Sequence, residues 1–360
     1  MANEVKKLNT IAITDIKNVN GQTDENIKEF NAQEFQGYAG TAGDWHGPRF
    51  VGMGDILYSP YTGYSYYDDI QYKAATSGGD AADWGSATKE AYGFAAGFSN
   101  GTRMVAMDGE IASPTTYDTT IDYITTASTG NTYDFGDVRI SKRYAAGCSD
   151  GTYGMSVGGY TGVAATAASL EYVTIASTGN SASWGEISSA VYGATQAHAG
   201  AIGGTTRGVL WNAKDGLTNI IEYWTWASTG DTSDFGDLST TADKVGDAGC
   251  EDTVRGVMYT IGGQWSPSGE GSENIEYITM STTGNSTDFG NATEYVSLSG
   301  SFSDGTRAES WGGRWYGPNN DAYTTATHIE YITIASAGNG TDAGDLDTDG
   351  MGFACASGSS

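Results

Sequence analysis

The chain has 360 residues, with 53 glycines, only 5 prolines and 12% aromatic residues. Because glycine readily adopts the positive φ angles of tight turns, this composition is typical of many short strands joined by turns. The formal net charge of −27 repels phosphate backbones and argues against nucleic acid as a partner.

The N-terminal sequence MANEVKKLNT is polar, and no long apolar run follows it. It predicts neither a signal peptide nor a membrane-spanning segment. We therefore expect synthesis in a cytoplasm, no membrane insertion, and release by lysis or by a dedicated route.

Residues 1–37 are expected to form an arm distinct from the rest of the chain. Two phrases in it, DIKNVNGQ (15–22) and NIKEFNAQEF (26–35), repeat each other at an offset of 11 residues. A segment this short cannot build its own core, so its apolar residues need a partner chain. The predicted anchors are Ile16, Val19, Ile27 and Phe30.

The remainder, residues 38–360, repeats one phrase six times, as in IDYITTASTGNTYDFGD at 121–137. Each copy carries a tyrosine, and successive tyrosines are 49 to 54 residues apart. They are Tyr72, Tyr123, Tyr172, Tyr223, Tyr277 and Tyr331. A period near 50 residues built from strands indicates a propeller with four-stranded blades.

Each blade is expected to contain strands A to D in chain order. A small-residue stretch such as YAAGCS (144–149) predicts strand A, and a phrase such as NGTRMV (100–105) predicts the A–B turn and the start of strand B. The tyrosine segment predicts strand C, and DFGD (134–137) predicts strand D.

The first blade lacks an obvious strand A. In the other blades an apolar residue stands five positions before the strand-B arginine or Tyr153, whereas Asp44 stands there before Arg49. The C-terminal MGFACASGSS (351–360) parallels YGFAAGFSNG (92–101), which puts Cys355 near the Phe98 position. We expect this segment to complete the blade of residues 48–90; residues 38–44 are the alternative.

The three cysteines, Cys148, Cys250 and Cys355, are about two repeats apart. Their odd number and wide spacing argue against a disulfide framework and favour core packing.

The repeat resembles kelch propellers over about residues 45–360. Gly-Gly pairs follow strand B, as at Gly158-Gly159 and Gly312-Gly313, although the usual Tyr-to-Trp spacing is replaced. The resemblance implies an all-β fold, a six-bladed kelch-like β-propeller preceded by a short extended arm.

Loop lengths divide the propeller into two ends. The strand-C tyrosine and the glycine of the DFG phrase are 13 residues apart in all six copies, as from 123 to 136, whereas strand B to strand C varies. A–B and C–D turns therefore define a constant end, and B–C and D–A connections a variable end. Aromatics of the B–C connections are the predicted ligand-binding residues, with capping of the core as their alternative role: Tyr61, Tyr64, Tyr66, Trp265, Trp315 and Tyr316.

Other recurring residues are expected to be scaffold. An arginine such as Arg103 recurs at the start of strand B in five similar phrases. A repeated acid such as Asp134 is its expected ion-pair partner. The STGN turns favour hairpin formation; calcium is the alternative, and no other cofactor or metal is expected. His46, His198 and His328 are not spaced in the sequence as metal ligands are. We expect no enzymatic activity, and leave a carboxylate-pair glycosidase open.

The arm also resembles the I-K-x-x-N-G leaders of structural proteins from tailed bacteriophages, especially marine ones, and the repeat resembles sequences from phage virion genes. The resemblance implies a virion protein assembled in the host cytoplasm and oligomeric on the particle. Residues 1–37 would bind other virion proteins, and the propeller, as tail fibre or capsid decoration, would bind a host-surface glycan or protein. A glycan-degrading propeller enzyme, sialidase-like or depolymerase, and a cellular kelch-type scaffold are the alternatives.

Overall fold

The computed structural model describes most of the repeat region and six short strands before it. The described ranges are 7–8, 11–12, 18–19, 22–23, 29–30, 33–34, 49–59, 63–75, 79–88, 95–111, 116–161, 168–188, 200–211, 219–239, 248–259, 273–294, 296–297, 299–316, 323–350 and 354–358. Over these ranges every regular element is a strand, and none is a helix that could cross a membrane. The chain divides into two compact units, Met1–Ala42 and Gly43–Ser360.

The first unit contains three antiparallel hairpins among its described residues. They are β1 (Lys7–Leu8) with β2 (Ile11–Ala12), β3 (Asn18–Val19) with β4 (Gln22–Thr23), and β5 (Glu29–Phe30) with β6 (Gln33–Glu34). Their starts are 11 residues apart, so EVKKLNTIAI (4–13) is a third copy of the phrase that the sequence analysis found twice. The predicted anchors Val19 and Phe30 belong to β3 and β5; Ile16, Ile27 and the expected boundary at 37/38 lie outside the described residues.

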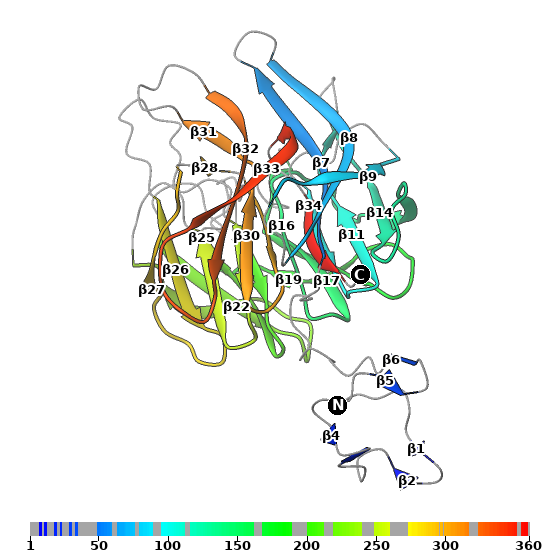
Figure 1. Ribbon diagram of the computed structural model, residues 1–360, viewed down its shortest axis with the longest axis vertical. Coiled ribbons are helices and arrows are strands. Elements are labelled where there is room, and N and C mark those ends of the chain that lie inside the picture. The colour runs from blue at the N-terminus through cyan, green and yellow to red at the C-terminus, as the bar shows by residue number, and fades with distance from the viewer. Residues whose placement is uncertain are drawn as a thin grey trace. The chain divides into compact units, whose positions relative to one another are not determined.

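The second unit is a six-bladed β-propeller, which confirms the predicted fold (Figure 1). From strand A to strand D, blade 1 contains β34 (Ala354–Gly358), β7 (Arg49–Ser59), β8 (Gly63–Ala74) and β9 (Ala82–Ser86), and blade 2 contains β10 (Ala96–Ser99), β11 (Arg103–Met107), β14 (Thr120–Thr125) and β15 (Tyr133–Asp137). In the same order, blade 3 contains β16 (Ala146–Ser149), β17 (Tyr153–Val157), β18 (Ser169–Thr174) and β19 (Ala182–Glu186), and blade 4 contains β20 (Gly200–Gly203), β21 (Arg207–Trp211), β22 (Ile220–Thr225) and β23 (Ser233–Asp237). Blade 5 contains β24 (Ala248–Glu251), β25 (Arg255–Tyr259), β26 (Asn274–Thr279) and β27 (Thr287–Asn291), and blade 6 contains β29 (Gly300–Ser303), β30 (Arg307–Trp311), β32 (Tyr323–Thr333) and β33 (Thr341–Gly350). The strand assignments read from the repeat are confirmed in every blade.

The ring closes through the C-terminal strand. β34 pairs antiparallel with β7, and it contacts β10 of blade 2 on one side and β29 of blade 6 on the other (Figure 1). The register agrees with the expectation that Cys355 lies near the Phe98 position. Val51, which is equivalent to Val105 opposite Phe98, lies opposite Ala356, and Cys355 lies opposite Gly52. Ala356 therefore takes the position equivalent to Phe98, and Cys355 is the residue next to it.

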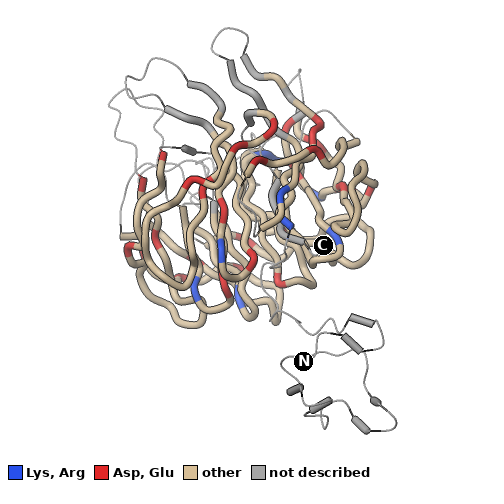
Figure 2. The backbone as a smooth tube through the Cα atoms, in the orientation of Figure 1, with Lys and Arg blue, Asp and Glu red and all other residues tan. Residues whose placement is uncertain are grey.

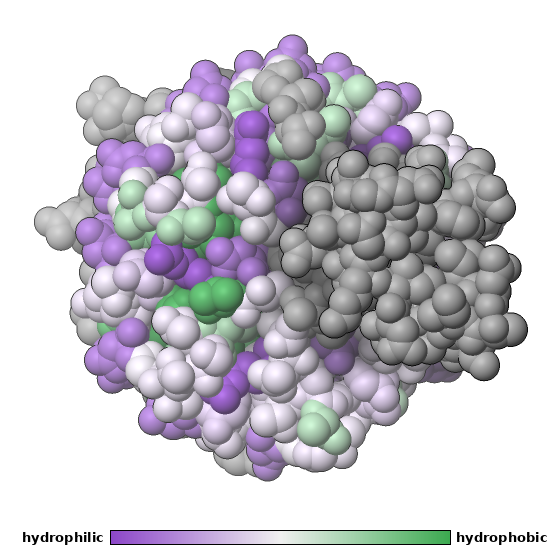
Figure 3. Space-filling model, turned by 60° about the horizontal axis from the view of Figure 1, so that its bottom comes forward, coloured by the Kyte–Doolittle hydropathy of each residue, from purple (hydrophilic) through white to green (hydrophobic). Residues whose placement is uncertain are grey.

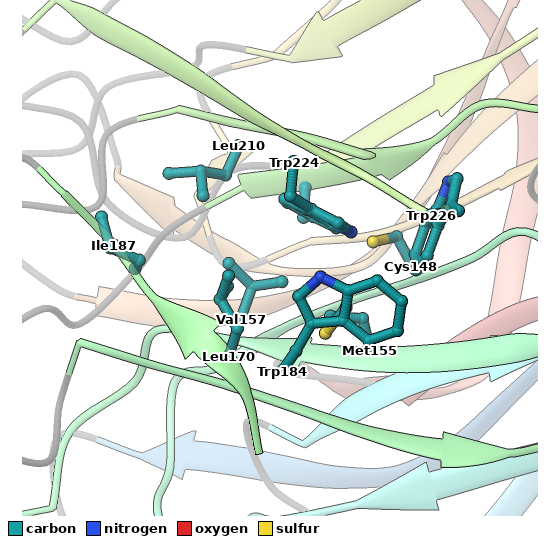
Figure 4. Packing of buried hydrophobic residues seen from close by; sticks show 10 residues of the cluster. Cys148, Met155, Val157, Leu170, Trp184, Ile187, Leu210, Trp224 and Trp226 are labelled. Carbon is teal, nitrogen blue, oxygen red and sulfur yellow. The ribbon is translucent and has the colours of Figure 1, made fainter. Parts of the chain in front are cut away.

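The hydrophobic core consists of clusters between neighbouring blades. Figure 4 shows the one between blades 3 and 4, where Trp184 and Trp226 lie near Cys148 and Met155. The Trp184 and Trp226 ring centroids are 5.8 Å apart in an edge-to-face arrangement. Cys148 and Cys250 are both buried as thiols, in agreement with their predicted packing role.

The constant length of the C–D turn has a structural cause. In every blade this turn donates two backbone hydrogen bonds to strand D of the preceding blade, as from Gly230 N to Trp184 O (2.9 Å) and from Thr232 N to Glu186 O (3.0 Å). The glycine of strand D allows the close approach, since a Cβ on Gly185 would lie 2.1 Å from Gly230 O. A longer or shorter turn could not make these contacts.

This contact gives a matched pair of substitutions. Gly185→Ala should destabilise the protein by about 2–3 kcal/mol, because overpacking against backbone cannot be relieved by a rotamer change. Gly230→Ala, on the other side of the same contact, should be nearly neutral, since its Cβ would meet nothing within 4 Å. Urea denaturation of both variants measures the difference, and equal stabilities would contradict this account.

Candidate functional site

The variable end carries the elements that break the repeat. In blade 1, β7 and β8 continue as a long hairpin beyond the part that pairs with β9. In blade 6, β31 (Arg314–Tyr316) pairs with β32 and with β28 (Val296–Ser297). Blades 6 and 1 are neighbours, so the two extensions arise from adjacent blades at the same end (Figure 1).

The predicted ligand-binding residues map to this end, mostly without described side chains. Tyr64 lies opposite Tyr58, and Tyr66 opposite Ile56, in the β7–β8 hairpin. Trp315 and Tyr316 lie in β31, opposite Thr324 and Tyr323. Tyr61 and Trp265 lie outside the described residues. The backbone thus brings four of the six predicted positions into two extended elements of neighbouring blades.

The recurring arginines stack on aromatic rings. Arg103 Cζ lies 4.2 Å from the Tyr123 ring centroid, and Arg103 Nη1 donates to Ile175 O of the next blade (3.0 Å). Arg49 and Arg255 make the equivalent bonds to Thr126 O and Ile334 O. The prediction that an acid such as Asp134 pairs with these arginines is wrong. Asp134 is exposed, and the guanidinium contacts a tyrosine ring and a backbone carbonyl of the next blade instead.

The Asn or Asp of each C–D turn also joins blades. Asn180 Oδ1 accepts a hydrogen bond from Asp137 N of the preceding blade at 3.1 Å, and equivalent bonds occur at all six interfaces. The side chains that invited a calcium interpretation are thereby engaged by backbone amides. The described residues also contain no cluster of three or more His, Cys, Asp or Glu that could hold a metal ion.

A ring of buried polar residues was not anticipated from the sequence. It consists of the residue before each strand-C tyrosine: Gln71, Asp122, Glu171, Glu222, Glu276 and Glu330. Glu330 Oε2, for example, accepts hydrogen bonds from both Thr293 N and Thr293 Oγ1 of the preceding blade at 2.7 Å. Several acids that could have formed a catalytic pair therefore accept hydrogen bonds from the neighbouring blade.

One place departs from this regular pattern, at the variable end between blades 2 and 3. Asp108 has φ +67°, and the equivalent positions Gly54, Gly158 and Gly312 are glycines with φ between +56° and +66°. An aspartate thus occupies a left-handed position that three other blades fill with glycine. Non-glycine residues held in such conformations concentrate at functional sites.

The Asp108 side chain is fully buried beside a second buried charge, Lys142. Its Oδ2 accepts a hydrogen bond from Ser156 Oγ, and its Oδ1 has no hydrogen-bond partner. Lys142 Nζ lies 3.3 Å from both Ser169 O and Ser169 Oγ. Burial raises the pKa of Asp108 to about 7, against the opposing attraction of Lys142.

Next to these two charges lies a group of five residues that we call the Arg143 cluster. It consists of Glu110, Tyr117, Arg143, Tyr144 and Tyr160. Arg143 Nη1 donates to Glu110 Oε2, and the guanidinium carbon lies 5.8, 4.8 and 5.3 Å from the ring centroids of Tyr117, Tyr144 and Tyr160. The Tyr117 and Tyr160 rings meet edge to face at 6.3 Å. All three tyrosines are half-buried. The sequence analysis missed this cluster because none of its residues belongs to the repeated phrase.

The raised pKa of Asp108 predicts a pH-dependent stability. Between pH 3.8, the ordinary value, and about 7 the native carboxyl keeps a proton that the unfolded chain loses, so rising pH destabilises the native state. Asp108→Asn mimics the protonated form and tolerates positive φ. We expect the variant to gain about 2–3 kcal/mol relative to wild type between pH 5 and pH 8. Urea denaturation at both pH values tests this; a constant difference would contradict it.

The constant end offers no comparable cluster among its described residues. Figure 3 turns this end toward the viewer, and among its coloured atoms hydrophobic green forms separate patches between polar residues. Val254, in an A–B turn, is one exposed apolar side chain (66%). Figure 2 shows Asp and Glu positions in both the upper and the lower part of the described propeller.

Together these features define the class of protein, a six-bladed β-propeller with a constant end built by its repeat and a variable end that departs from it. Comparison of the sequence with protein-family models and with curated proteins gave no match.

Proposed function

We propose that this propeller is a non-enzymatic binding module of a bacteriophage particle, which binds a host-surface glycan or protein through its variable end. The N-terminal unit would attach it to other virion proteins. The resemblance of the arm and of the repeat to phage structural sequences supports the virion assignment. The three short hairpins of the first unit support the attachment role, because isolated two-residue strands are not stable without a partner surface.

The observation that carries the binding role is the division of labour between the two ends. At the constant end, the glycine of strand D and the Asn or Asp and two backbone amides of the C–D turn make contacts between neighbouring blades at all six interfaces. At the variable end the chain path differs from blade to blade, through the β7–β8 extension, β31 and the Arg143 cluster. Binding residues commonly lie on loops that a rigid scaffold positions, and this end has that organisation.

The test is binding of fluorescently labelled protein to host cells. Replacing Trp315 and Tyr316 together with alanine should weaken binding at least tenfold, since aromatic anchors commonly contribute about 2 kcal/mol or more. Asn180→Ala is the control: it removes a constant-end hydrogen bond and should lower stability slightly while leaving binding unchanged. Binding that follows Asn180 instead, or no cell binding at all, would overturn the proposal.

The runner-up is a glycan-degrading enzyme, and one observation favours it. A carboxyl that stays protonated near neutral pH, as Asp108 does, is what the general acid of a glycosidase requires. However, the Asp108 side chain is 0% exposed, whereas a general acid must reach the scissile oxygen. Release of reducing ends from host polysaccharide by the purified protein would favour the enzyme over the binding module.

A further inference from the structure

We infer that the Arg143 cluster is a subsite for an uncharged sugar ring, with Tyr117 and Tyr160 as stacking surfaces and the Arg143 guanidinium, which the buried Glu110 holds in place, as the donor to ring hydroxyls. This inference rests on the proposed function and names the ligand class and the residues within the variable end.

Three connections of the chain hold the subsite in place. Arg143 and Tyr160 exchange two backbone hydrogen bonds, N to O at 3.1 and 2.7 Å. Gly109 N donates to Lys142 O (2.8 Å), and Asp118 N donates to Gly109 O (3.0 Å). The small hairpin of β12 (Glu110–Ile111) and β13 (Thr116–Tyr117) sets Glu110 directly opposite Tyr117. The polar and aromatic groups are thus ordered before any ligand arrives, which lowers the entropic cost of binding.

The buried charges beneath the cluster position it. The hydrogen bond from Gly109 N to Lys142 O joins the residue after Asp108 to the residue before Arg143. The turn at Asp108 is therefore connected directly to the segment that carries the cluster. A Cβ at Gly159 would lie 3.0 Å from Lys142 Cδ, so this glycine leaves room for the lysine side chain. Asp108 thus combines a positive φ angle with a fully buried carboxyl, and Lys142 is fully buried as well, at the end where the fold departs from its repeat.

The chemistry of the cluster selects among ligand classes. A cation is disfavoured because the Arg143 guanidinium already lies over the three tyrosine rings. An anion is disfavoured because Glu110 neutralises Arg143 and the chain carries a net charge of −27. Edge-to-face tyrosines beside a guanidinium whose charge the buried Glu110 balances offer apolar surface together with hydrogen-bond donors. A pyranose ring presents that combination, an apolar C–H face with hydroxyls around its rim.

The experiment uses the full chain on an array of neutral and sialylated oligosaccharides, with host-cell binding measured in parallel. We expect binding to neutral members, weakened at least tenfold by Tyr117→Ala and by Tyr160→Ala and retained by Tyr160→Phe, which keeps the ring. Tyr133→Ala is the matched control, since Tyr133 is 61% exposed at the constant end. Unchanged urea midpoints establish that each variant is folded.

The outcomes separate this inference from the proposed function. If the alanine variants bind sugars as wild type does, if sialylated members bind more tightly, or if cells are bound while no neutral sugar is, the subsite assignment is wrong and the binding module stands. If neither cells nor sugars are bound, the proposed function fails, and the subsite fails with it.

Discussion

A chain that lacks residues 354–360 should not form a stable monomeric propeller. Its β7 would lose its antiparallel partner, and β10 and β29 would lose the strand that lies between them. The hydrogen-bonding edge of β7 would then be exposed, and such edges recruit other chains. We expect the free energy of unfolding, about 5–15 kcal/mol for an ordinary domain, to fall by more than half. Urea denaturation and size-exclusion chromatography measure the loss and the expected association.

The control for this truncation is removal of Ser359 and Ser360 alone, which lie beyond β34. That variant should match wild type in both measurements. A chain without residues 354–360 that kept its midpoint and its monomeric state would show that β34 does not hold the ring closed.

The second large effect is expected at the interface between blades 6 and 1. Lys73 Nζ lies 3.3 Å from Glu309 Oε1, both side chains are buried, and Glu309 also receives hydrogen-bond or ionic contacts from Trp311 and Arg307. Burial raises the pKa of Glu309 and lowers that of Lys73. Glu309→Val leaves Lys73 without its acid and should cost about 3–5 kcal/mol, since an unpaired buried charge is strongly unfavourable.

The residues at the other five blade interfaces indicate a second variant that should restore the lost stability. There the equivalent pair is apolar, as with Val51 and Ile124 in one core cluster and Val257 and Ile332 in another. The double variant Lys73→Ile/Glu309→Val copies that arrangement and should recover most of the lost stability. A double variant as unstable as Glu309→Val alone, or a single variant as stable as wild type, would contradict this reading of the pair.

The repeat made the fold predictable because each recurring residue has a contact in every blade. The strand-C tyrosine, the strand-B arginine and the glycine of strand D identified the strands correctly. The residue of β34 that lies opposite Val51 could not be predicted, because this strand consists of small residues and no side-chain pattern fixes its pairing. The acidic partner of the arginines was wrong because a planar guanidinium can stack on an aromatic ring as well as pair with a carboxylate.

The candidate site was less predictable, because its residues are singular rather than repeated. In the sequence Asp108 is one acid among forty-four. A signal was nevertheless available: aligned on strand B, Asp108-Gly109 replaces the Gly-Gly pair of blades 3 and 6. Lys73 could have been found likewise, since the other blades carry an apolar residue directly after the strand-C tyrosine. Departures from a repeat are thus more informative about function than the repeat itself.

The pairing of β34 with β7 also fixes an order of events during synthesis. β34 follows β7 by about 300 residues, so the two strands leave the ribosome tens of seconds apart at about 5–20 residues per second. During that interval the nascent chain can stack blades 2 to 6 but cannot complete blade 1. On a polysome the waiting β7 of one chain lies near the finished β34 of another, and exchange between them would yield linked rings. The β7 edge is therefore the place where this topology favours pairing with another chain during synthesis.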